Sequence, residues 1–198
     1  MAVSKLSLAS VRNGFAKSNT FWDQTTFAPV FDSIQTIVVG SGGASSVTFS
    51  GIPQSYQHLQ VRVFARSTAS AVTLQSLSIS INGDTTSGNY YFHRLQGNGT
   101  AVSSDAYAGE REIMQLPAAN ALASVFSSGV IDILDYTSLN KNKTVRSLNG
   151  KDFNGNSSGL IVLQSELYMA TPTAITSLTF SATLAQYSHF ALYGIKGA

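Results

Sequence analysis

The side chains that most often carry out catalysis or hold metals are few and scattered in this chain. Histidine occurs only at His58, His93 and His189, each in a different predicted strand and none with a partner two or four residues away. We interpret all three as structural, hydrogen-bonded histidines. No cysteine is present, which excludes disulfides and thiolate metal sites. The sequence therefore predicts no metal site and no cofactor.

Paired carboxylates are the other arrangement that would support acid–base chemistry. Asp132 and Asp135 are an odd number of positions apart, so on a strand they would point to opposite faces. We expect Asp135 to end a strand and bond backbone in the following turn. Glu110 and Glu112 would share a face of an extended segment, but nothing in the sequence marks their partner. We predict that the protein is not an enzyme, because no nucleophile, base and orienting group come together.

One aromatic segment could bind a ligand instead. Tyr90, His93 and Arg94 lie in the run NYYFHRL, and aromatic rings beside polar groups can stack on the sugar rings of a glycan. The alternative is that these rings pack in the core and against neighbouring strands. We take Tyr90, His93 and Arg94 as candidate surface-recognition residues.

The candidate residues sit in segments whose alternation predicts β-strands. In residues 57–66 apolar side chains alternate with His, Gln and Arg, and in residues 76–81 Leu and Ile alternate with Ser. The groups Asn82-Gly83-Asp84 and Gly97-Asn98-Gly99 follow such runs and suit turns, because Asn and Gly tolerate a positive φ. The centre of the chain is therefore predicted to be antiparallel β.

The same pattern continues to the C-terminus. We count about eleven short segments from Ile34 onward and predict an all-β fold, an antiparallel β-sandwich or jelly roll of 8–11 strands over residues 34–198. We interpret the glycine-rich run 40–43 as a hairpin turn, because a strand rather than a helix follows it and a phosphate site needs a helix N-terminus. Residues 101–123 are predicted to be loop with a short strand at 111–117, and residues 118–126 to start with one helical turn.

The amino-acid composition limits the classes of partner that the protein could bind. Of the 198 residues 11% are charged, and the net charge of +2 creates no strong field, so nucleic-acid binding is not expected. No run approaches the roughly 20 apolar residues of a membrane span. The first residues lack a continuous apolar segment, so we expect neither a signal peptide nor membrane association.

Residues 1–33 differ from the rest and are predicted to form an extended N-terminal arm. Five aromatic residues between 15 and 31, including the only Trp, are not typical of a disordered tail. The arm either folds back on its own domain or docks on a neighbouring subunit, where Trp and Phe are frequent anchors. Its candidate interface residues are Leu6, Leu8, Phe15, Phe21, Trp22, Phe27 and Phe31.

Several motifs together resemble a family of small β-rich structural proteins of tailed bacteriophages. They are I-P-x-x-Y-x-H-L-Q from Ile52, N-G-D from Asn82, H-R-L-x-G-N-G from His93, D-I-L-D-Y from Asp132 and F-A-L-Y-G-I-K from Phe190. The resemblance covers residues 31–198 and implies a jelly-roll-like virion protein with no catalytic residues. It also implies a location on the exterior of the virion, with assembly in the cytoplasm of the bacterial host.

Two placements on a particle follow from this resemblance. The protein could be a capsid decoration or cement protein whose arm docks on subunits of the major capsid protein. It could instead belong to the tail, as a tail fibre or short appendage that binds a host receptor such as a surface glycan. The lack of a coiled coil or repeat for a shaft favours decoration. Either use favours a homo-oligomer, and the three-fold sites of phage particles favour a trimer.

Overall fold

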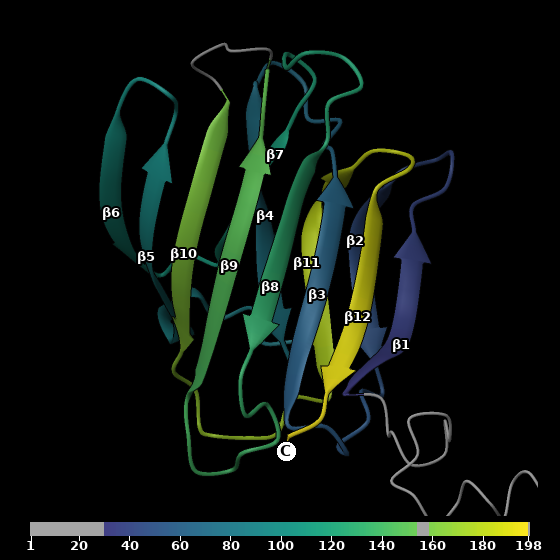
Figure 1. Cartoon of the computed structure of the whole chain (residues 1–198), viewed down its shortest axis with the longest axis vertical. Helices are drawn as coiled ribbons and strands as arrows, with labels where there is room; N and C mark the ends of the chain where they lie inside the picture. Colours follow the sequence, from purple (N-terminus) through teal and green to yellow (C-terminus); the bar gives the residue numbers. More distant parts are fainter. Residues whose placement is uncertain (1–29, 154–158, 198) are drawn as a thin grey trace, which may run out of the picture. The chain divides into compact units, whose positions relative to one another are not determined.

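The computed structural model describes residues 30–153 and 159–197. The fold below is that of the unit formed by residues 31–198. The described residues form antiparallel strands and a single 3-10 turn, η1 (Ser87–Asn89) (Figure 1). The predicted β-sandwich is thereby confirmed. No helix within the described ranges is long and apolar enough to span a membrane.

Twelve strands are formed by the described residues, one more than the upper end of the predicted range. They are β1 (Phe31–Val38), β2 (Ala44–Ser50), β3 (His58–Ala65), β4 (Leu74–Ile81), β5 (Tyr90–Gly97), β6 (Val102–Ala108), β7 (Glu112–Pro117), β8 (Ser127–Ile133), β9 (Lys143–Lys151), β10 (Leu160–Tyr168), β11 (Ser177–Leu184) and β12 (His189–Ile195).

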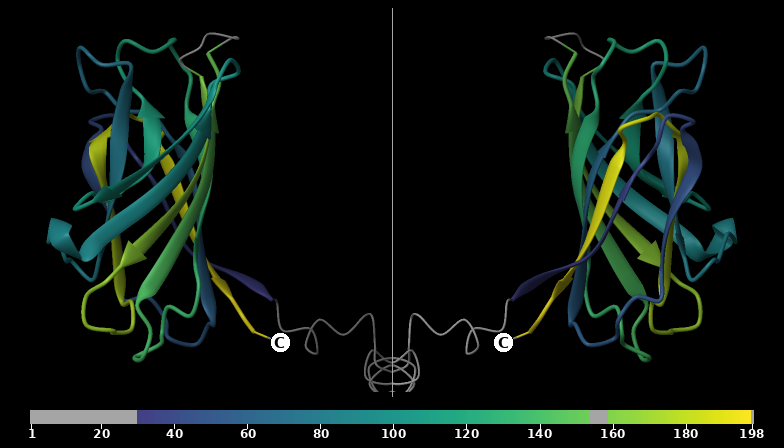
Figure 2. Two further views of the ribbon diagram at one scale, coloured as in Figure 1. Left: turned by 90° about the vertical axis from the view of Figure 1, so that its left-hand side faces the viewer. Right: turned by 90° about the vertical axis from the view of Figure 1, so that its right-hand side faces the viewer.

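The strands form two sheets that face each other (Figure 2). The larger has the order β1-β12-β3-β8-β9-β10-β5-β6, and the smaller has the order β2-β11-β4-β7. Eight of these strands form a jelly roll, in which β1-β12-β3-β8 of the larger sheet face β2-β11-β4-β7 of the smaller one. The remaining strands come from two insertions, β5 with β6 between β4 and β7, and β9 with β10 between β8 and β11. We call β9-β10-β5-β6, which extend the larger sheet, the wing.

The glycine-rich run after β1 is a turn, but the predicted hairpin is wrong. β1 pairs with β12 in the larger sheet and β2 pairs with β11 in the smaller one, so the turn carries the chain between sheets. Gly43 has a φ of 68°, and a Cβ there would lie 2.7 Å from the backbone oxygen of Leu184. This crossing therefore requires glycine at position 43.

The interior of the jelly roll is apolar. Leu59, Val61 and Val63 of β3 are buried, as their alternation predicts. The ring of Phe180 lies 6.4 Å from that of Phe49 on the neighbouring strand of the smaller sheet, and 5.7 Å from that of Phe190 on the larger sheet. The contact between Phe180 and Phe190 joins the two sheets in one core.

Residues 101–126 depart most from the sequence prediction. The predicted strand at 111–117 is present as β7, but β6 was missed because it consists mainly of Ser, Ala and other weakly apolar residues and lies at an exposed sheet edge. The predicted helical turn in residues 118–126 is wrong, since these residues form turns instead. The turn predicted at Asp135 is present, with a φ of 48°, but its carboxylate accepts from Lys141 Nζ at 2.7 Å instead of from backbone, and its N–H donates to His58 Nδ1 at 3.0 Å.

Candidate interaction surface

The three candidate recognition residues do not share a surface. Tyr90 is fully buried, and its hydroxyl accepts from the N–H of Ile81 at 3.0 Å and donates to the carbonyl of Asp84 at 2.9 Å. Arg94 also faces the interior, because residues two or four positions apart lie on one face of β5. Only His93 is exposed. The prediction of a joint recognition surface is therefore wrong for Tyr90 and Arg94.

Most of the predicted arm interface lies outside the described residues, namely Leu6, Leu8, Phe15, Phe21, Trp22 and Phe27. Phe31 is described, and it belongs to the sandwich as the first residue of β1, opposite Ile195. Its ring lies 5.3 Å from that of Tyr193, and the guanidinium of Arg62 lies over both rings. The β domain thus begins three residues before its predicted start at Ile34.

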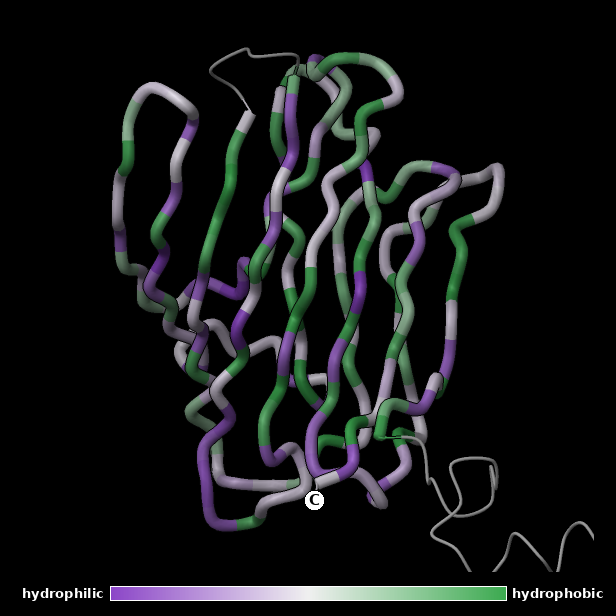
Figure 3. The backbone as a smooth tube through the Cα atoms, in the orientation of Figure 1, coloured by the Kyte–Doolittle hydropathy of each residue, from purple (hydrophilic) through white to green (hydrophobic). Residues whose placement is uncertain are grey.

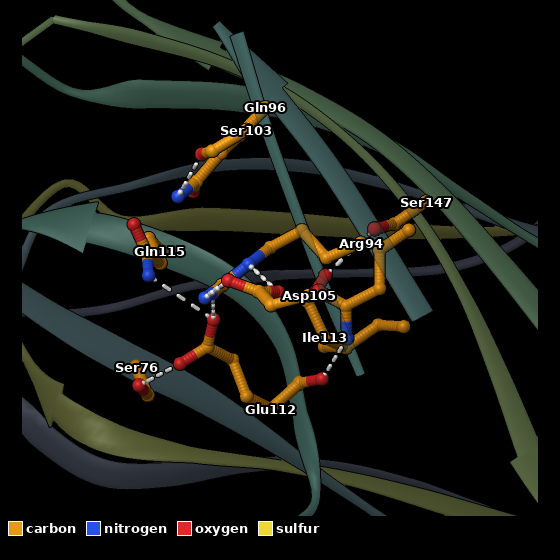
Figure 4. A network of polar contacts seen from close by, with 10 residues as sticks. Ser76, Arg94, Gln96, Ser103, Asp105, Glu112, Ile113, Gln115 and Ser147 are labelled. Atoms are coloured by element: carbon orange, nitrogen blue, oxygen red, sulfur yellow. Dashed lines mark hydrogen bonds and ion pairs between the residues drawn. The ribbon is translucent and has the colours of Figure 1, made fainter. Parts of the chain in front are cut away.

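Arg94 is the centre of a polar network that joins the wing to the smaller sheet (Figure 4). It donates to both carboxylate oxygens of Asp105 on β6, at 2.9 and 2.8 Å, and to Glu112 on β7 at 2.5 Å. Glu112 also accepts from Ser76 and from Gln115. Burial opposes the charge of the guanidinium, but Asp105 and Glu112 outweigh it and raise the pKa of Arg94. Glu112 therefore has the partner that the sequence did not reveal.

Polar side chains of the wing also bond the free edge of β7, the last strand of the smaller sheet. Ser147 Oγ on β9 donates to the carbonyl of Ile113 at 2.7 Å, and Gln164 Nε2 on β10 donates to the carbonyl of Glu112. An uncovered sheet edge leaves backbone groups without partners. These inward polar residues supply some of those partners, so the network has a structural role.

Two charged residues lie deeper under the wing. Burial raises the pKa of Glu166 to about 9 and lowers the pKa of Lys151 to about 8. Both carboxyl oxygens of Glu166 are inaccessible to solvent and have no hydrogen-bond partner among the described residues. A substrate could not reach this carboxyl group without the sandwich opening, so we do not assign it a catalytic role.

The outer face of the larger sheet carries exposed apolar side chains where the wing begins. Leu148, Leu163 and Leu95 stand directly opposite one another on β9, β10 and β5. In Figure 3 the upper half of β10 is hydrophobic. We define the outer apolar patch as Phe64, Leu95, Val102, Leu148, Ile161 and Leu163, which are between 45% and 75% exposed.

The patch includes a projection and a depression. Ile161 is 69% exposed, and its two cross-strand neighbours are Gly97 and Gly150. Beside it lies a shallow groove of about 450 Å³, whose lining includes Arg62, Val130, Leu148, Gly150 and Ile161.

A polar row borders the patch. Arg146 on β9 pairs with Asp132 on β8 at 3.1 Å, and Gln60 on β3 donates to the same carboxylate at 2.9 Å. An apolar centre with a polar margin is the usual composition of a protein–protein interface. The sequence analysis missed this patch, although the run GLIVL before and within β10 is a recognisable signal, since it is apolar on both faces of a strand.

No group of three or more His, Asp or Glu that could hold a metal ion occurs within residues 30–153 and 159–197. Comparisons of the chain with protein-family models, with curated proteins and with solved structures find no match.

Proposed function

We propose that this protein is a non-enzymatic structural component of a bacteriophage particle, a capsid decoration or cement protein on the exterior of the virion. The outer apolar patch carries this proposal. A group of neighbouring exposed apolar side chains with a polar margin is a common feature of protein contact sites. A jelly roll held by a continuous core is a rigid body on which such a contact surface can be maintained.

In this proposal residues 1–30 attach the protein to neighbouring subunits of the major capsid protein. Their aromatic residues would be buried at that contact, and burial stabilises by about 25 cal/mol per Å² of apolar surface. Each decoration subunit would thereby link shell subunits and raise the temperature at which the shell opens.

The test is to compare heat-induced release of DNA from particles that contain and lack the protein. We expect release at a lower temperature when the protein is missing. A matched particle whose decoration protein lacks residues 1–29 should lose occupancy and behave like the particle without it. Identical release profiles, together with lost adsorption to the host, would contradict decoration.

One observation favours the alternative, a tail appendage that binds a host glycan. An open depression of about 800 Å³ is lined by Tyr187, Gln186, Thr183 and Arg66, among others. Tyr187 is 68% exposed, and an exposed aromatic ring beside polar groups can stack on a sugar. Under this alternative Tyr187→Ala would reduce phage adsorption without changing the heat stability of the shell.

A further inference from the structure

We infer that the free edge of β6 pairs with β6 of a second copy of this chain, so that two wings join edge to edge in one antiparallel sheet with Ser104 at the two-fold axis. This edge pair goes beyond the proposed function and does not depend on it.

The backbone of β6 leaves a row of donors and acceptors without a strand beside it. β6 ends the larger sheet, and no other described strand lies on its outer side (Figure 1). The N–H of Gly109 donates to the carbonyl of Tyr90 at 2.9 Å, and this bond fixes which residues of the ladder face β5. The residues whose N–H and C=O groups point away from β5 are Val102, Ser104, Ala106 and Ala108. An extended strand of another chain presents the matching alternation of groups.

Among the free edges of the described sheets, β6 is the most regular. It pairs with β5 over its whole length without a register shift. At the other end of the larger sheet, β1 shifts register between Ser33 and Gln35, and the pairing of β2 with β11 shifts between Ser181 and Leu184. The wing donates to the edge of β7. Irregular or covered edges are how sheets avoid joining one another, and β6 has neither protection.

The side chains of β6 leave room for a neighbouring strand. Ser104, Ala106 and Ala108 are small and exposed, and the strand contains neither Lys nor Pro, which often block an edge. Its one charge is on Asp105, which points inward and accepts from Arg94 with both carboxylate oxygens. An inward charge can also guard an edge, but Arg94 compensates the charge of Asp105.

Asp105 decides the register of the edge pair. A two-fold axis at Asp105 would set the two carboxylates opposite each other, which is unfavourable for like charges. An axis at Ala106 would set Asp105 opposite Tyr107 of the second copy, whose hydroxyl is at the far end of a ring. An axis at Ser104 sets Asp105 opposite Ser103 of the second copy, and a serine hydroxyl is a short donor.

The hydroxyl of Ser103 is suited to that contact. It accepts from Gln96 Nε2 at 3.2 Å, so its own hydrogen is available for the carboxylate of the second copy. In the same register Ser104 pairs with Ser104 of the second copy, and Val102 pairs with Ala106 in both directions. These backbone pairs exchange about six hydrogen bonds across the axis.

Cysteine substitution tests the edge pair directly, because the chain contains no cysteine. The two Ser104 Cα atoms would be about 5.5 Å apart, within the range of about 4.4–6.8 Å that a disulfide spans. We expect full-length Ser104→Cys at micromolar concentration to form a disulfide-linked dimer on mild oxidation, seen by non-reducing electrophoresis. Ala106→Cys is the matched control on the same exposed edge. Its counterpart would lie about 14 Å further along the second strand, so it should stay unlinked.

Sedimentation equilibrium of the full-length protein without cysteine measures the edge pair itself. We expect a dimer, and we expect Ala106→Pro to weaken it at least about tenfold, because proline removes a donor to the second copy in each chain. The bonds of β6 to β5 do not use the N–H of Ala106, so the variant should fold. Ala108→Pro is the control: in the proposed register Ala108 lies opposite Thr100 of the second copy, outside β6, so the dimer should persist. Circular dichroism melting would show whether both variants are folded.

Three results would overturn the edge pair. They are a monomeric wild type, linking of Ala106→Cys as fast as Ser104→Cys, and an undiminished dimer of folded Ala106→Pro. None of them would affect the proposed attachment through residues 1–30, because that is measured by occupancy on particles. The edge pair and the proposed function can therefore fail independently.

Discussion

The two halves of the larger sheet distribute their side chains in opposite ways. In the jelly-roll half, β3 directs Leu59 and Val61 inward and Gln60 and Arg62 outward. In the wing, β10 directs Gln164 and Glu166 inward and exposes Ile161 and Leu163. One continuous hydrogen-bonded sheet thus changes its buried face from apolar to largely polar along its width.

The difference follows from what lies opposite each half. The jelly-roll half faces four strands with apolar side chains, whereas the smaller sheet ends at β7. Beyond β7 the wing faces a strand edge whose carbonyls need donors, and Arg94 of the wing pairs with Glu112 on that strand. The jelly roll therefore supplies the stability of the domain, and the wing offers a surface for contact.

The largest effect is expected in the jelly-roll core. Phe180→Ala removes a fully buried ring between Phe49 and Phe190, and we expect the free energy of unfolding to fall by about 3–5 kcal/mol. Denaturant unfolding followed by far-ultraviolet circular dichroism measures this free energy. In the wing, Leu163→Ala should cost the monomer less than about 1 kcal/mol, since Leu163 is half exposed. Equal losses would contradict the division between the two halves.

The next effect concerns the link between wing and smaller sheet. Arg94→Met keeps most of the side-chain volume but leaves Asp105 and Glu112 without their cation. We expect a loss of about 2–3 kcal/mol, somewhat below that of a fully buried pair because Asp105 is partly exposed. The control is Lys141→Met, which removes the exposed partner of Asp135 and should change stability by less than about 0.5 kcal/mol. Similar values for the two variants would show that the Arg94 network contributes no more than a surface ion pair.

Much of the jelly roll could be predicted from the sequence because its strands alternate strictly. The runs that became β3 and β4 have one apolar face each, and the turn after β4 uses Asn82 and Gly83 with positive φ, as expected. Sheet membership could not be predicted: the short turn through Gly43 links two sheets, and pairing depends on partners far away in the chain.

The wing was harder to predict for a physical reason. Strand alternation identifies two faces but not which of them is buried, and the candidate residues Tyr90, His93 and Arg94 came from both faces of β5. Tyr90 and Arg94 point inward, where the hydroxyl of Tyr90 and the guanidinium of Arg94 find partners on other strands. The partner of Glu112 was equally invisible, because Arg94 is 18 positions away and on the opposite sheet.

A smaller effect is expected where the two halves meet. Gly129 on β8 faces inward, and a Cβ there would lie 2.9 Å from Asn149 Cβ and from the end of the Met114 side chain. Met114 can move but Asn149 Cβ is fixed by the backbone of β9, so Gly129→Ala should cost about 1–2 kcal/mol. Gly150→Ala, on the outward face of the neighbouring strand, meets nothing closer than 3.7 Å and serves as the control. If thermal unfolding showed no change in stability for Gly129→Ala, β8 and β9 would be able to move apart at little cost.

The last effect is gradual and depends on pH. The pKa of Glu166 is raised from 4.5 to about 9 by burial, with Glu112 raising it further and Arg111 opposing. The folded state therefore binds more protons than the unfolded state between these values, so this contribution to stability is complete below about pH 4.5 and is lost as the pH rises through 9. The slope cannot exceed about 1.4 kcal/mol per pH unit.

Glu166→Gln isolates this contribution, because the amide has nearly the same shape and does not titrate. We expect the free energy of unfolding of the wild type to decline relative to the variant as the pH rises from 5 to 8, by up to about 1 kcal/mol per unit. Lys151 acts in the opposite direction above pH 8, where its lowered pKa of about 8 makes the folded state bind fewer protons than the unfolded state, so the comparison is made below that pH. If urea unfolding gave parallel curves of unfolding free energy against pH for the two proteins, the carboxyl group of Glu166 would have to be in contact with water. The wing would then lack the dry polar interior that distinguishes it from the jelly roll.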